Sequence, residues 1–106
     1  MKQLKFAPHL RDIILSGEKT ATWRLGNDYD IQTGDIVSFV GDGSEFAKAK
    51  ITSYKEVSFA NMTEEDKMGH EQYASDEEKY AAFKGYYGLE VGPDTPVKIF
   101  KFSLIK

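Results

Sequence analysis

The sequence predicts a mainly β, α+β domain, in which a small and mostly antiparallel β-barrel carries an N-terminal helix and a helical insertion before the last strand. Apolar residues at every second position predict strands at 46–58 and 97–105, and a further strand is predicted at 36–40, after a tight turn at 33–35. Apolar residues at helical spacing appear near the N-terminus and again between 75 and 88. With 106 residues, 41% of them hydrophobic, the chain suffices for one domain (1–106) with one core.

The N-terminal elements follow from local signals. Residues 3–6 predict a short strand, and Pro8 suits the first turn of a helix because its missing N–H costs nothing there. Gly17 is placed to end that helix in a left-handed conformation. The residues that share the helical face are Leu10, Ile13 and Ile14.

From Thr20 onwards the apolar period changes to two. Ala21, Trp23 and Leu25 are expected to point toward the core, which leaves Thr22 and Arg24 together on the opposite face.

Turn residues predict how the later elements connect. Residues 41–44 form a strong hairpin signal between the strand at 36–40 and a long second arm, in which we expect a bend. Thr63 with Asp66 predicts the start of one short helix. Ser75 with Glu78 predicts a capping box for a second helix, which Gly88 ends.

Composition narrows the class of protein. The chain has no cysteine, which excludes a disulfide, a thiolate nucleophile and a zinc–thiolate site. No apolar run approaches the roughly 20 residues of a membrane span, and the N-terminus lacks a signal-peptide stretch, so we expect a soluble cytoplasmic protein without a membrane partner. The net charge of −3 argues mildly against binding along duplex phosphates.

We expect neither a metal nor another cofactor. His9 and His70 are the two histidines of the chain, and no carboxylate cluster has metal-ligand spacing. The glycines match neither a phosphate-binding loop nor a dinucleotide fingerprint.

The most informative segment is 17–24, Gly-Glu-Lys-Thr-Ala-Thr-Trp-Arg. It places Lys19, Thr22 and Arg24 at the junction of a helix and a strand, where polar groups are held in fixed geometry. Taken singly, each residue has a simpler interpretation: a solvated lysine, a β-forming threonine and an arginine in a surface ion pair. Of the aromatic residues, Tyr29 is the best candidate for stacking on a base, because its neighbours are polar.

The pattern Gly17-x-Lys19-x-x-Thr22-x-Arg24 resembles the signature of ASCH domains, and the order of elements along nearly the whole chain fits as well. The resemblance implies a PUA-like β-barrel with a cleft lined by the motif. In length and motif the chain is similar to the small bacterial N4-acetylcytidine amidohydrolases of that family.

For site residues, the resemblance implies Lys19 as base, Thr22 as nucleophile and a glutamate of the helical insertion as acid. The acid falls best on Glu71, although other carboxylates crowd the same region: Glu64, Glu65, Glu77 and Glu78. Arg24 is expected to hold the substrate carbonyl or an oxyanion, with Thr20 and Tyr29 as further substrate-binding candidates.

The chemistry sets conditions on these groups. A free lysine has a pKa of about 10.4, so a neutral Lys19 needs burial and the nearby Arg24 cation to lower its pKa. An ionised Glu71 opposes that shift, whereas a protonated Glu71 removes the conflict and can donate to a leaving amine.

The leading hypothesis is therefore an amidohydrolase that releases acetate from N4-acetylcytidine or related acylated cytosine nucleosides. An RNA-binding or modified-nucleotide-binding module, in which Lys19 and Arg24 contact phosphate, is the alternative, and RNA cleavage is a third possibility.

Overall fold

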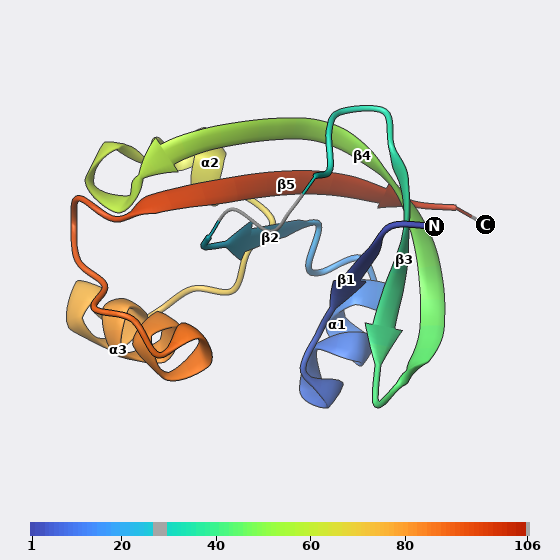
Figure 1. Ribbon diagram of the computed structural model, residues 1–106, viewed down its shortest axis with the longest axis horizontal. Helices are drawn as coiled ribbons and strands as arrows, with labels where there is room; N and C mark the ends of the chain where they lie inside the picture. The colour runs from blue at the N-terminus through green and yellow to red at the C-terminus, as the bar shows by residue number, and fades with distance from the viewer. Residues whose placement is uncertain (27–29, 106) are drawn as a thin grey trace.

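The computed structural model describes residues 1–26 and 30–105 and centres on one five-stranded sheet with the order β1-β3-β4-β5-β2. β1 pairs with β3 in parallel, and the other pairings are antiparallel. The sheet curls into half a barrel whose two edges are β1 and β2 (Figure 1). The strands are β1 (Gln3–Lys5), β2 (Ala21–Arg24), β3 (Ile36–Gly41), β4 (Ser44–Ser58) and β5 (Pro96–Leu104).

The helices flank this sheet as the sequence predicts. The 3-10 turn η1 (Pro8–Leu10) and α1 (Arg11–Leu15) follow β1, while η2 (Phe59–Asn61), α2 (Glu64–Lys67) and α3 (Asp76–Tyr87) form the insertion between β4 and β5. In Figure 1, α1 lies beside β1, and α3 lies at the opposite end of the molecule. The predicted α+β fold class is confirmed. None of these helices has the length and apolar character needed to cross a membrane.

Turn and cap residues explain where the elements begin and end. Asp42 and Gly43 both have positive φ angles, 52° and 78°, as expected for the two-residue hairpin turn between β3 and β4. The pairing of β4 with β5 shifts register between Ile51 and Ser53, within the arm where we expected a bend.

The helices of the insertion start at the predicted caps. The Thr63 side chain accepts from the Asp66 amide at 3.1 Å, and the Asp66 carboxylate accepts from the Thr63 amide at 3.0 Å. The Ser75 hydroxyl accepts from the Glu78 amide at 3.1 Å, which is one of the two bonds of the predicted capping box. Gly88, with a φ angle of 68°, ends α3 in the left-handed conformation.

The buried apolar side chains form two clusters, one at each end of the curled sheet. The strand β5 contributes to both clusters. Phe100 and Phe102 belong to the first cluster, and Val97 and Ile99 belong to the second. The first cluster includes Leu4, Ile14, Val37, Phe39 and Ile51, and the second includes Trp23, Leu25, Phe59, Met62 and Phe83.

Candidate active site

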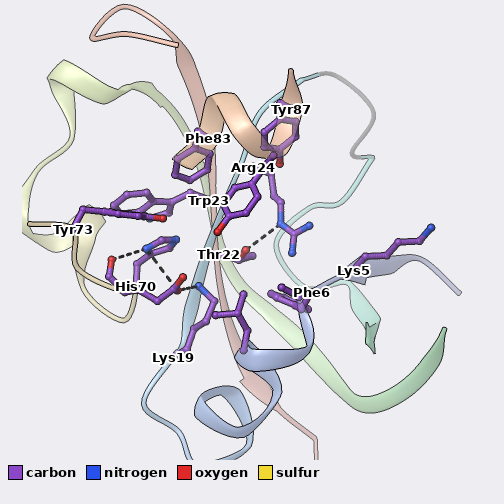
Figure 2. A pocket seen from close by; sticks show the side chains of 14 residues that line it. Lys5, Phe6, Lys19, Thr22, Trp23, Arg24, His70, Tyr73, Phe83 and Tyr87 are labelled. Atoms are coloured by element: carbon purple, nitrogen blue, oxygen red, sulfur yellow. Dashed lines mark hydrogen bonds and ion pairs between the residues drawn. The ribbon is translucent and has the colours of Figure 1, made fainter. Parts of the chain in front are cut away.

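A cavity of about 270 Å³ lies where the two edges of the half-barrel approach the insertion. Its walls come from the end of β1, from β2, from the segment before α3 and from α3 itself (Figure 2). The lining residues are mostly aromatic or apolar, with a few charged groups among them: Lys5, Phe6, Ala7, Leu10, Lys19, Thr22, Trp23, Arg24, His70, Glu71, Tyr73, Phe83, Tyr86 and Tyr87.

Lys19 and Glu71 form an ion pair in this cavity. Lys19 is 3% exposed, and its ammonium group bonds to Oε1 of Glu71, whose side chain is 31% exposed. Burial lowers the pKa of Lys19, and this effect outweighs the bond with Glu71 that raises it; Arg24 lowers the pKa further. Both causes that the sequence suggested for a less basic lysine are therefore present.

Glu71 is ionised in the unliganded protein. Burial raises its pKa, but the adjacent His70 and the bond from Lys19 together bring the pKa below its ordinary value. The protonated carboxyl that the chemistry calls for is thus not the resting form. The competing carboxylates lie on exposed first turns of α2 and α3, and none of them lines this cavity: Glu64, Glu65, Glu77 and Glu78.

Gly69 holds the segment that carries Glu71 close to the segment that carries Lys19. Its carbonyl oxygen accepts from the amides of Thr20 and Ala21, at 2.8 and 3.1 Å, which fixes the insertion against the start of β2. Gly69 has a φ angle of 83°, and a Cβ atom there would lie 2.1 Å from the Thr20 hydroxyl. Thr20 is exposed and does not line the cavity, so its place in the structure is this backbone contact; its substrate-binding role stays a prediction.

Thr22 and Arg24 share one face of β2, as the alternation predicts. Thr22 is 4% exposed, and its Oγ1 accepts from Nε of Arg24 at 3.0 Å. The guanidinium carbon of Arg24 lies 4.7 Å from the ring centre of Phe6, so the arginine rests on an aromatic face. A hydroxyl oxygen that accepts a bond from a cation loses its proton more readily. Thr22 is thus a buried hydroxyl that accepts a bond from a cation, and its role as the nucleophile stays a prediction.

His70 is the site residue that sequence reasoning did not select. Its side chain is 4% exposed, and its ring stacks on Trp23 with centres 3.7 Å apart and planes 12° apart. Burial and the Lys19 cation lower the pKa of His70 to about 4. Its position directly before Glu71 was the available signal.

The aromatic walls also come largely from the insertion. Tyr73, Tyr86 and Tyr87 line the cavity, and Tyr73 and Tyr87 also pack against the second core cluster. Tyr86 is 65% exposed and stands at the mouth of the cavity. Burial raises the pKa of Tyr73, so its phenol stays protonated. Tyr29 lies outside the described residues, and its stacking role stays a prediction.

Within residues 1–26 and 30–105, no three or more His, Asp or Glu side chains gather as metal ligands would. The nitrogen Nε1 of Trp23 is buried without a hydrogen-bond partner in that part of the chain.

Solved structures resemble this fold over nearly the whole chain. A protein of the DUF984 family from Enterococcus faecalis superimposes with a TM-score of 0.75, at 20% identity over 92% of this chain and 70% of that chain. An ASCH domain from Lactobacillus crispatus gives 0.69, at 21% identity over 91% and 70%. The ASCH protein from Zymomonas mobilis gives 0.62, at 13% identity over 95% and 65%. Protein-family models and curated protein sequences give no match.

Proposed function

Because this chain has the fold of the ASCH domains, as its motif suggested, we propose that it is an amidohydrolase that releases acetate from N4-acetylcytidine or related N4-acylated cytosine nucleosides. In this proposal Thr22 is the nucleophile, Lys19 the base and Glu71 the acid, with Arg24 beside the reacting oxygen. The observation that carries the proposal is the pairing of the buried Lys19 with the half-buried Glu71, which share a cavity with the Thr22 hydroxyl.

A second lysine–glutamate pair of the same sheet shows why the first is suited to proton transfer. Nζ of Lys98 lies 2.6 Å from Oε2 of Glu56, and this bond raises the pKa of Lys98. The pKa of Lys19 is instead lowered, although it also has a carboxylate partner. Of these two pairs, the one in the cavity has the lysine that loses its proton more readily.

In the proposal, substrate binding further favours the uncharged form of Lys19. A planar base that fills the cavity expels water, and a drier environment disfavours two separated charges. Transfer of one proton from the Lys19 ammonium to the Glu71 carboxylate then leaves a neutral amine and a carboxylic acid. The pair thus supplies a base and an acid from a single internal proton.

The reaction proceeds by acyl transfer. Lys19 takes the Thr22 proton as Oγ1 bonds to the acyl carbon, and Arg24 stabilises the negative charge that develops nearby. The carbon–nitrogen bond breaks as Glu71 gives its proton to the departing exocyclic nitrogen, which leaves as the free amine. Water then hydrolyses the Thr22 ester to acetate, which restores the hydroxyl.

The size and walls of the cavity support a small aromatic substrate. A volume of about 270 Å³ is at the lower end of ligand pockets and suits a nucleobase. Tyr73 and Tyr86 offer rings on which a base can stack.

The test is incubation of the protein with N4-acetylcytidine, followed by chromatographic detection of cytidine. Lys19→Met is expected to abolish turnover, while Lys98→Met, which removes another buried lysine with a glutamate partner, retains it. Equal activity in the protein and in Lys19→Met contradicts the proposal. Binding of short RNA that weakens as salt rises, without any hydrolysis, favours the RNA-binding alternative instead.

A further inference from the structure

His70 lines the same cavity, yet the acyl-transfer steps do not use it. Its imidazole stacks on Trp23 and is almost completely enclosed, with 4% of the side chain exposed. Figure 2 shows the ring between Trp23 and Lys19. Because the imidazole is stacked and enclosed, its ring nitrogens keep one orientation relative to a ligand in the cavity.

The hydrogen bond of His70 fixes its tautomer. Nδ1 lies 2.9 Å from the backbone carbonyl oxygen of Glu71, and a carbonyl oxygen can only accept, so Nδ1 carries the proton. The pKa of about 4 keeps the ring neutral at physiological pH. Nε2 therefore presents a lone pair and no proton. In the described residues, no side chain or backbone group donates to Nε2.

An acceptor is unusual among the polar groups near the reacting centre. Lys19 and Arg24 are donors, and the Thr22 oxygen already accepts from Arg24. Besides Nε2, a ligand N–H in this cavity can meet the partly exposed Glu71 carboxylate or the phenol oxygens of the lining tyrosines, and of these Nε2 is the one fixed in a buried ring. The scissile amide of an N4-acylated cytosine carries such an N–H on the nitrogen that must leave.

Resting on the proposed function, we infer that Nε2 of His70 is a specificity-determining acceptor for the N–H of the scissile amide. This contact turns the acyl carbon toward Thr22 and restricts the enzyme to amides whose nitrogen carries a hydrogen. An amide whose nitrogen carries a methyl group in place of hydrogen leaves Nε2 unpaired and is rejected. Sites that hydrogen-bond a substrate group discriminate strongly against analogues that lack it.

The experiment compares N4-acetylcytidine with N4-acetyl-N4-methylcytidine as substrates. The unchanged protein is expected to prefer the secondary amide by a factor on the order of 100 in kcat/KM. His70→Phe keeps a ring against Trp23 but lacks the acceptor, and we expect the preference to fall to within about threefold. His70→Gln, whose side-chain oxygen accepts, is expected to restore part of it. His9→Phe is the control, since His9 is exposed on η1 and does not line the cavity.

A preference that persists in His70→Phe shows that the methyl group is excluded by its size, and this result overturns the inference. Absence of cytidine release by the unchanged protein contradicts the proposed function instead. In that case binding still tests His70, because Trp23 is the single tryptophan of the chain and its fluorescence reports ligands beside the stacked ring. Equal affinity of the two compounds then overturns the inference, and loss of a difference in His70→Phe supports it.

Discussion

The carbonyl oxygen of Gly69 accepts from the backbone amide of Thr20 at 2.8 Å, and this bond places the insertion beside the motif at the start of β2. We predict that Gly69→Ala displaces the segment that carries His70 and Glu71, because the added methyl group would meet the Thr20 hydroxyl. Activity is expected to fall by at least about 100-fold, since misplaced catalytic groups cost that much.

Gly43→Ala is the matched control for this substitution. Gly43 also has a positive φ angle, 78°, but a Cβ atom there has no neighbour within 4 Å. We expect it to lose about 1–2 kcal/mol of unfolding free energy from backbone strain alone and to keep full activity. Denaturant unfolding and the cytidine-release assay measure both variants. Equal activity loss in the two would show that the close approach at Gly69 is unimportant.

We predict that acid destabilises the protein through His70. Its pKa is about 4 in the folded chain and 6.5 in the unfolded chain, so the unfolded state binds more protons between these values. Stability is therefore complete above pH 6.5 and falls by about 3 kcal/mol as pH drops to 4. Unfolding free energies measured across this range should show a shallower decline in His70→Phe, with His9→Phe as control. The same slope in all three proteins contradicts the assignment.

Arg24→Lys is expected to lower kcat/KM by about 10- to 100-fold while stability changes little. Lysine keeps the charge but cannot both donate from the Nε position to Thr22 and lie flat over Phe6. Arg11→Lys is the control, because Arg11 also lies over an aromatic ring, with its guanidinium carbon 6.0 Å from the ring centre of Phe46. Arg11 is exposed and does not line the cavity. Steady-state kinetics with N4-acetylcytidine distinguish them, and an unaffected Arg24→Lys would remove Arg24 from the reaction.

Glu71→Gln is predicted to reduce kcat by at least about 100-fold, because the amide can neither take the Lys19 proton nor return one to the leaving nitrogen. It also leaves a buried ammonium without a counter-ion, which is expected to lower the unfolding free energy. Glu56→Gln changes the equivalent partner of Lys98 and should leave turnover intact. Turnover of Glu71→Gln at the normal rate would rule out Glu71 as the acid.

Local sequence signals predicted the elements well, since each depends on neighbouring residues. The Thr63 cap, the hairpin at Asp42 and the end of α3 at Gly88 all appear where short-range chemistry placed them. The alternation along β2 correctly put Thr22 and Arg24 on one face. It did not reveal that Thr22 is also buried, because the insertion that helps to cover it folds back from far along the chain.

Sequence patterns alone predicted only the site residues that lie within the segment 17–24. The motif supplied Lys19 and Thr22, and the resemblance supplied Glu71, which the structure brings to Lys19. His70 and Tyr73 were missed because their importance comes from contacts with Trp23 and the cavity, which periodicity does not encode. Thr20 was selected by its place in the motif, but its side chain is outside the cavity and faces Gly69.

Lys19 and Glu71 are separated by 52 positions, and the bond that aligns their segments joins β2 to the insertion. If the proposed roles hold, the ribosome releases Lys19 and Thr22 before Glu71, so an emerging chain lacks the proposed acid until the insertion has been made. Release of cytidine from N4-acetylcytidine can thus serve as an end-point signal for completed folding. Two fragments divided between β4 and the insertion are expected to regain it only when mixed.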